Sequence, residues 1–171
     1  MTKYLICAFL SAAGAAIVHE AGHVAASMLC GRRVNRLRAV MGGLSMMMSG
    51  TSSYGETLFI ASGGAVFNLI SALLLLPFPS LSLFCRFSFG TAIYNLIPLP
   101  GTDGEMMLLS ILSWKIKRCD APMTAVRITR GVSDIFLALF FVLVIYINAV
   151  GVGDGAALLL ALVFMLMRKT A

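Results

Sequence analysis

The sequence has few charged residues and almost no histidine. Only 12% of its 171 residues are Asp, Glu, Lys or Arg, whereas 60% are hydrophobic, and the mean hydropathy is +0.96. An ordinary soluble domain is about one quarter charged and about half apolar, so a soluble chain of this length could not bury so much apolar surface. The composition excludes that class and predicts an all-α polytopic membrane protein that contacts the lipid bilayer directly.

Closely spaced cysteine pairs are also absent. Cys7, Cys30, Cys85 and Cys119 lie far apart and form no C-x-x-C motif, which argues against a zinc ion held by sulfur. We expect free thiols, with a Cys7–Cys85 disulfide as the alternative. The net charge of +6 does not indicate nucleic-acid binding, because the basic residues lie in loops between apolar stretches and are not interleaved with aromatic residues.

Five apolar stretches are candidate transmembrane helices, judged against the roughly 20 residues that cross a bilayer. The third is interrupted by Pro98, Pro100 and Gly101, and the fifth is short. The stretches cover about residues 4–30, 56–77, 83–110, 130–149 and 155–168.

The basic residues orient these five stretches. Eleven of the 13 follow the first, third or fifth stretch, and only Lys3 and Arg86 lie on the other side. Loops rich in Lys and Arg stay in the cytoplasm, so we expect an N-terminus outside and a C-terminus inside. The alternative is that residues 1–16 form a cleavable signal peptide, which would reverse every later helix.

Residues 31–54 differ from the apolar stretches. The segment "VNRLRAV" alternates polar and apolar residues, a Gly42-Gly43 pair follows, and "LSMMMSG" completes the pattern. This predicts a small membrane-associated β-hairpin between the first two transmembrane helices. A flexible cytoplasmic loop is the alternative.

The first apolar stretch contains the only two histidines, in the segment "VHEAGHVAAS". His19 and His23 are four residues apart and therefore share one face of a helix, where both imidazoles can reach one metal ion. Glu20 lies next to them and can act as a general base without binding the metal. Ionisable residues within a membrane helix are costly and indicate a functional site.

A zinc site with two histidines needs a further protein ligand. Glu20 is the expected base, and four of the other six carboxylates lie in loops or at the ends of apolar stretches. Elimination leaves Asp103 and Glu105, in "YNLIPLPGTDGEMM", where prolines and glycine break the third stretch. A broken helix at membrane depth is tolerated where it lines a cavity. A basic loop follows the stretch that contains His23, and another follows the stretch that contains Asp103. At the rise of an α-helix, each of the two residues lies about 12 Å or more from its loop, so both are expected at a similar depth in the membrane.

The segments "HEAGH" and "NLIPLPGTDG", in this order and spacing, resemble the site-2 protease family of intramembrane zinc metalloproteases. The segment "SGGAVFN" at residues 62–68 resembles the small-residue and asparagine segment of the family's intervening helix, although Gly64 stands where relatives usually have proline. The chain is most similar to the compact branch that includes sporulation-factor-processing enzymes. The resemblance covers about residues 10–110.

The resemblance implies a Zn²⁺ ion held by His19, His23 and Asp103, with Glu20 as the general base. Many relatives carry glycine where this chain has Glu105, so Glu105 is an alternative ligand or a gate. Asn68 and Asn95 are candidates for binding the substrate backbone or the oxyanion, with interhelical hydrogen bonds as the alternative role.

The implied function is hydrolysis of a peptide bond within or near a transmembrane segment of a protein substrate. We expect one metalloprotease domain over residues 1–171, with a catalytic core at about 4–110, accessory helices at about 130–168, and no PDZ or nucleotide-binding domain. The implied location is a bacterial cell membrane, and an unidentified membrane protein could regulate the enzyme. A zinc-binding protein or transporter without protease activity, and a structural protein in which polar residues only join helices, are the alternatives.

Overall fold

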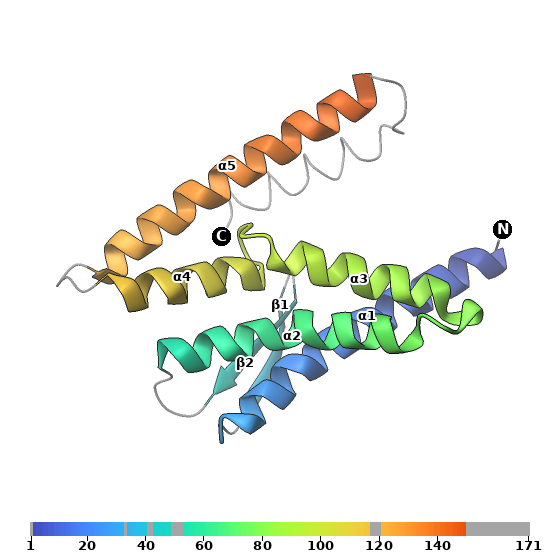
Figure 1. The fold of residues 1–171 in the computed structure, drawn as a ribbon, viewed down its shortest axis with the longest axis horizontal. Coiled ribbons are helices and arrows are strands. Elements are labelled where there is room, and N and C mark those ends of the chain that lie inside the picture. The colour runs from blue at the N-terminus through green and yellow to red at the C-terminus, as the bar shows by residue number, and fades with distance from the viewer. Residues whose placement is uncertain (1, 33, 41–42, 49–52, 117–120, 150–171) are drawn as a thin grey trace.

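The computed structural model describes residues 2–32, 34–40, 43–48, 53–116 and 121–149. Helices α1, α2 and α3 pack against one another, α4 continues beyond the end of α3, and α5 packs on α4 (Figure 1). The elements in chain order are α1 (Thr2–Leu29), β1 (Val34–Val40), β2 (Gly43–Met48), α2 (Tyr54–Leu75), the 3-10 helix η1 (Pro79–Leu81), α3 (Ser82–Leu96), α4 (Asp103–Lys115) and α5 (Ala121–Ala149).

Three helices in the described part of the chain are long and apolar enough to cross a membrane. They are Thr2–Leu29, Tyr54–Leu75 and the segment Met123–Tyr146 of α5. The first two coincide closely with the predicted stretches 4–30 and 56–77. This part of the fold is compatible with a membrane protein.

The other three predicted stretches agree less closely with the helices of the structure, and one of them lies outside the described residues. The stretch 83–110 is interrupted where predicted and forms two helices, α3 and α4, because the chain leaves the helical conformation at Ile97, the residue before Pro98. The helix that contains the fourth predicted stretch, α5, begins at Ala121, so the boundary predicted at residue 130 is wrong. The predicted stretch 155–168 lies outside the described residues.

The segment between α1 and α2 contains two short antiparallel strands. Val34 pairs with Met48 and Val40 with Gly43, and the register shifts between Val34 and Arg36. The strands lie within the segment 31–54, where polar and apolar residues alternate. Residues 41–42, which separate them, are outside the described part.

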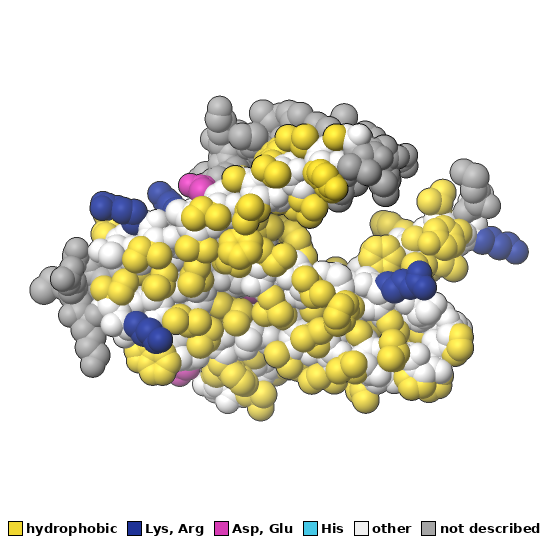
Figure 2. Space-filling view, turned by 45° about the horizontal axis from the view of Figure 1, so that its top comes forward, with side chains coloured by type: hydrophobic (Ala, Val, Ile, Leu, Met, Phe, Trp, Pro, Cys, Tyr) yellow, Lys and Arg dark blue, Asp and Glu magenta, His cyan; other side chains and the backbone are white. Residues whose placement is uncertain are grey.

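The described helices bury small and polar residues and expose large apolar ones. The largest side chains that are fully buried are Asn68, Ser27, Ser88 and Ser133. Leu29, by contrast, is 77% exposed. Hydrophobic side chains cover most of the face in Figure 2, with Lys and Arg near its two ends. Small residues at helix contacts and apolar residues facing outward are typical of helices that pack in lipid.

Two glycines, Gly22 and Gly63, permit a close contact between α1 and α2. A Cβ built on Gly22 would collide with the backbone carbonyl of Gly63, and one built on Gly63 would lie 2.6 Å from the carbonyl oxygen of Gly22. Only glycine permits two helix backbones to approach this closely. This crossing lies one residue before His23 on α1, so it brings the candidate metal ligands of α1 against α2.

The ends of α1 and α2 are joined on the side opposite to the N-terminus. Arg32, just after α1, forms an ion pair with Glu56 in the first turn of α2, with 2.5 Å between Nη2 and Oε2. Glu56 also accepts a hydrogen bond from the Ser53 backbone N–H, while the Ser53 hydroxyl caps the helix. These contacts place the C-terminal end of α1 beside the N-terminal end of α2, and the two helices run in opposite directions (Figure 1).

Candidate metal centre

His19 and His23 project from the same face of α1, as their spacing predicts. They are 6% and 8% exposed, and their ring centroids are 4.8 Å apart. Both side chains are therefore removed from the surface of a helix whose outer face is apolar. Burial of two imidazoles is costly unless their nitrogen atoms find partners.

The loop between α3 and α4 positions the third member of the site. Pro98 and Pro100 cannot donate backbone hydrogen bonds, and Gly101 has a positive φ of 82°, which turns the chain into α4. The Thr102 hydroxyl lies 2.7 Å from the Ile97 carbonyl oxygen and 2.8 Å from that of Leu99.

The same hydroxyl of Thr102 also accepts a hydrogen bond from the Leu99 N–H. Because Thr102 is only 3% exposed, these bonds hold the loop in one conformation immediately before Asp103. Asp103 is the first residue of α4. The broken helix therefore presents this carboxylate in a fixed direction.

The structure brings His19, His23 and Asp103 together. Asp103 Oδ2 lies 2.9 Å from Nε2 of His19 and 3.2 Å from Nε2 of His23, and the two Nε2 atoms are 3.2 Å apart. Asp103 Oδ2 is buried, yet it has no well-aligned hydrogen-bond donor among the described residues. The three atoms therefore surround a common point rather than form an ordinary hydrogen-bonded pair.

A hydrogen bond at Nδ1 of His23 determines the tautomer of this ring, and so the state of the Nε2 atom that faces the common point. Nδ1 lies 2.8 Å from the backbone carbonyl oxygen of Ile60 on α2. A carbonyl can only accept, so Nδ1 carries the proton, and in the neutral ring Nε2 directs its lone pair toward Asp103. A second hydrogen bond of this kind is typical of histidines that bind metals.

The side chain of Asn68 forms a hydrogen bond with Nδ1 of His19. Its side-chain amide lies 3.3 Å from Nδ1 of His19, and the residue is fully buried. With the amide nitrogen toward the ring, Asn68 Oδ1 is buried without a partner. Exchanging the amide oxygen and nitrogen lets Oδ1 accept the Nδ1 proton and leaves the Nε2 lone pair of His19 facing the cluster. Both histidines then present lone pairs to the same point.

The spacing of the three atoms fits a zinc ion. Zinc–nitrogen and zinc–oxygen bonds of about 2.0–2.2 Å in tetrahedral geometry separate neighbouring ligand atoms by roughly 3.3–3.5 Å. The observed separations are 2.9–3.2 Å, so the side chains need to move apart by only a few tenths of an ångström. Two imidazoles and one carboxylate are also a donor set that zinc binds in enzymes, with one position left for water.

Gly64 on α2 leaves space beside the two rings. A Cβ added at this position would lie 2.5 Å from His23 Nε2 and 2.7 Å from His19 Nε2. At the present spacing of α1 and α2, a side chain at this position would have to displace the ligand atoms or move the helices apart. Gly64, which departs from the motif that the sequence otherwise resembles, thus lies directly against the candidate metal centre.

Glu20, the predicted general base, is half-buried on α1. It follows His19 by one residue, which turns its side chain by about 100° around the helix. Glu20 is not one of the three residues whose ligand atoms converge. This placement agrees with a residue beside the metal centre that is not a ligand.

The remaining predicted site residues lie outside the cluster. The Asn95 side chain donates to the backbone carbonyl of Thr91 in its own helix, with 3.0 Å between nitrogen and oxygen. Asn68 forms the interhelical hydrogen bond that was the alternative role at this position. Glu105 Oε2 accepts from the Gly101 N–H at 2.8 Å, and Glu105 is not a member of the described group that could hold a metal.

Three supporting features are not evident from the sequence pattern. They are the carbonyl of Ile60, the Thr102 hydroxyl and the absence of a side chain at Gly64. The threonine beside the proline break was a detectable signal, because Thr stabilises turns through its hydroxyl. No side-chain pattern could have indicated a backbone carbonyl.

Comparison with models of known protein families gives no match to this chain, and comparison with curated protein sequences gives no significant match. The similarity to site-2 proteases therefore depends on the motif residues. Of these residues, the structure brings His19, His23 and Asp103 together.

Proposed function

We propose that this protein is an intramembrane zinc metalloprotease of the site-2 protease type. The observation that carries the proposal is the convergence of two histidines from α1 and one aspartate from α4 on a single point between apolar helices. Side chains that only joined helices would pair donors with acceptors. Here three potential ligand atoms face one another, and Gly64 leaves room beside them.

In this proposal His19, His23 and Asp103 hold a Zn²⁺ ion. Zinc in such a site activates water and polarises a peptide carbonyl. Glu20 accepts the proton of the attacking water and returns it to the leaving nitrogen. Asn68 keeps His19 in the tautomer that binds metal, and Asn95 remains a candidate for binding the substrate backbone or the oxyanion once its contact with Thr91 opens.

The proposed arrangement in the bilayer has about five transmembrane helices, with α3 and α4 together forming the third. The end of the molecule that carries Arg32 and Lys115 faces the cytoplasm, so the N-terminus lies outside and the C-terminus inside. The strands β1 and β2 then lie beside the cytoplasmic face of the membrane. The candidate metal centre is nearer to this face than to the other.

The proposed substrate is a transmembrane segment of another protein in the same membrane, which we take to be a bacterial cell membrane. An α-helix hides its carbonyls in internal hydrogen bonds, so the substrate must unwind locally before it can be cut. Unwound backbone is tolerated within a membrane only against protein or water. The protease must therefore offer polar partners near the metal centre.

The test uses the purified protein in detergent and a co-expressed single-span membrane protein. We expect one zinc per chain in the wild type, loss of zinc in His19→Ala, and full zinc without cleavage in Glu20→Gln. Cleavage by Glu20→Gln at the wild-type rate would disprove the role of Glu20.

Two other results would identify the competing functions. Stoichiometric zinc with no cleavage of any membrane protein from the same genome neighbourhood would favour a zinc-binding protein or transporter. No zinc in the wild type would favour a structural role for the polar residues.

A further inference from the structure

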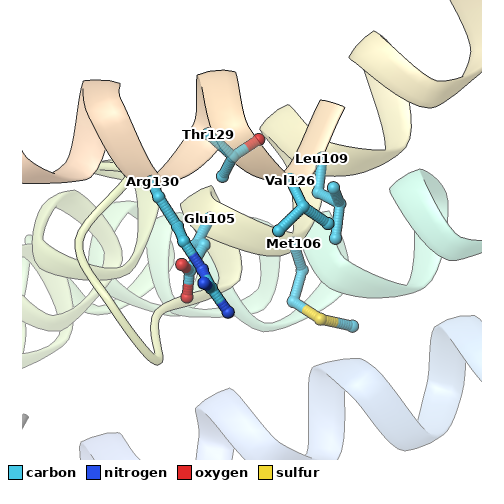
Figure 3. Close-up of a pocket in the computed structure, with 6 residues that line it drawn as sticks. All are labelled: Glu105, Met106, Leu109, Val126, Thr129 and Arg130. Atoms are coloured by element: carbon cyan, nitrogen blue, oxygen red, sulfur yellow. The ribbon is translucent and has the colours of Figure 1, made fainter. Parts of the chain in front are cut away.

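A pocket of about 270 Å³ lies between α4 and α5, outside the candidate metal centre. Its volume is too small for a helix, whose diameter with side chains is about 10–12 Å, but it can accommodate part of an extended chain. Figure 3 shows the six lining residues, with charged side chains from both helices among apolar ones. They are Glu105, Met106, Leu109, Val126, Thr129 and Arg130.

The pocket is connected directly to the loop that carries Asp103. Glu105 follows Asp103 by two residues, and its Oε2 accepts a hydrogen bond from the Gly101 N–H at 2.8 Å. A ligand that contacts Glu105 therefore lies next to the loop that positions the metal ligand. Glu105 is also the residue at which this chain departs from many members of the family that it resembles.

The pocket lining carries two opposite charges, from Glu105 on α4 and Arg130 on α5. In Figure 3 both side chains extend to the same side of α5 and cross in this view. Within the described ranges, no ion pair joins the two side chains. Arg130 is exposed, and Glu105 is half-buried, with Oε2 engaged by the loop.

The two charged residues lie at matching levels of their helices. Glu105 precedes Lys115 by ten residues and Arg130 follows Ala121 by nine, so both lie about 14–15 Å along their helices from the connection between α4 and α5. Arg130 is one of the basic residues that place this connection in the cytoplasm, so the pocket lies toward the cytoplasmic end of the proposed transmembrane helices.

The chemistry of the pocket selects its ligand. A simple anion would be repelled by Glu105 and a simple cation by Arg130. A peptide group offers an N–H donor to the carboxylate and a C=O acceptor to the guanidinium, and both bonds are strengthened by the charges. Met106, Leu109 and Val126 provide apolar surface for the side chain of such a residue.

We propose that the pocket between α4 and α5 binds the unwound backbone of the transmembrane substrate, with Glu105 accepting a peptide N–H and Arg130 donating to a peptide carbonyl. The inference rests on the proposed protease function and adds a substrate-binding site to it. The two bonds replace hydrogen bonds that the substrate helix loses on unwinding, next to the loop that carries Asp103.

Crosslinking tests the contact without requiring catalysis. A photoreactive amino acid replaces Val126 in the Glu20→Gln protein, and the probe is a Leu/Ala peptide of about 25 residues with a central Asn-Gly pair and terminal lysines, reconstituted in the same vesicles. The control carries the photoreactive residue at Ile135, which is 62% exposed on α5 and outside the pocket. We expect crosslinks at the central Asn-Gly region from position 126 only.

Kinetics on the active protein provide the second measurement. Loss of one charge-assisted hydrogen bond in Arg130→Gln should raise KM about tenfold while kcat and zinc content stay unchanged. Glu105→Leu should raise KM similarly, and Glu105→Gln, which keeps an acceptor oxygen, should recover most of the loss. Arg127→Gln is the matched control, because Arg127 is an exposed basic residue of α5 that does not line the pocket.

The outcomes separate this inference from the protease proposal. Equal crosslinking from positions 126 and 135, or an unchanged KM in Arg130→Gln, overturns the pocket assignment while cleavage and zinc binding stand. If Glu105→Leu loses zinc because the Gly101 contact is broken, Arg130→Gln decides, since Arg130 makes no contact with that loop among the interactions of the described residues. Absence of zinc and cleavage in the wild type refutes the protease proposal itself.

Discussion

His19 and Asp103 are far apart in the chain, yet His19 Nε2 and Asp103 Oδ2 lie 2.9 Å apart. One is on α1 and the other begins α4, and α2 packs against both helices. Their contact depends on two local features, the close crossing of α1 and α2 and the rigid turn before α4. Each of these features can be tested separately from catalysis.

Gly64→Ala should lower the zinc content while all three ligands remain. The added methyl group would lie within about 2.7 Å of both Nε2 atoms, so the rings must turn away from the common point. Zinc content of the purified protein, measured against protein concentration, checks this. Gly90→Ala is the control, because its Cβ meets no atom within 4 Å. Equal zinc in the two variants would contradict the proposed place of the ion.

Asn68→Leu should weaken zinc binding about 10- to 100-fold, the usual cost of losing the hydrogen bond that orients a ligand histidine. Asn68→Asp should retain the affinity, because a carboxylate also accepts the Nδ1 proton of His19. Competition with a zinc chelator gives the affinities. ¹⁵N shifts of His19 report the tautomer independently of metal, and an unchanged tautomer in Asn68→Leu would argue against this role.

Thr102→Val should loosen the turn that positions Asp103. The substitution keeps the shape of the side chain but removes a buried hydroxyl that bonds Ile97 and Leu99, at a cost of roughly 1–3 kcal/mol. We expect a lower midpoint of thermal unfolding and weaker zinc binding. Thr102→Ser retains the hydroxyl and should keep most of both properties, so equal losses in Val and Ser variants would exclude the hydrogen bonds as the cause.

Gly22→Ala should separate α1 from α2. Its new methyl group would collide with the Gly63 backbone, and overpacking of this kind costs about 1–3 kcal/mol. Thermal unfolding in detergent and zinc content should both fall. Gly14→Ala on the same helix meets only the Phe84 ring at 3.3 Å, which can shift, so this variant should be at least as stable as the wild type. A stable, zinc-replete Gly22→Ala protein would count against a tight crossing.

The shared orientation of His19 and His23 on α1 could be predicted because it depends on helix geometry alone. Residues four apart share a face of any helix, and a long apolar stretch without prolines forms a helix whatever it packs against. The same reasoning placed α1 and α2 to within two residues at each boundary. It placed the start of α5 nine residues too late, because Ala121–Thr129 contains polar and basic residues that hydropathy excludes but helix propensity tolerates.

The roles of neighbouring polar residues could not be predicted in this way. Glu105 and Asp103 were equivalent candidates by elimination, and only the loop geometry directs Asp103 into the cluster while Glu105 turns back to Gly101. Asn68 and Asn95 were likewise equivalent. The packing of α2 against α1 brings Asn68 to His19, whereas Asn95 bonds its own helix.

The sequence by itself determined the apolar character of the chain, the shared face of His19 and His23 and the break in the helix before Asp103, because each follows from a local run of residues. Only the tertiary structure decided which carboxylate meets the histidines, which backbone carbonyl orients His23 and how closely Gly64 approaches the two imidazole rings. These relations join atoms on different helices, and their distances are set by how closely the helix backbones pack.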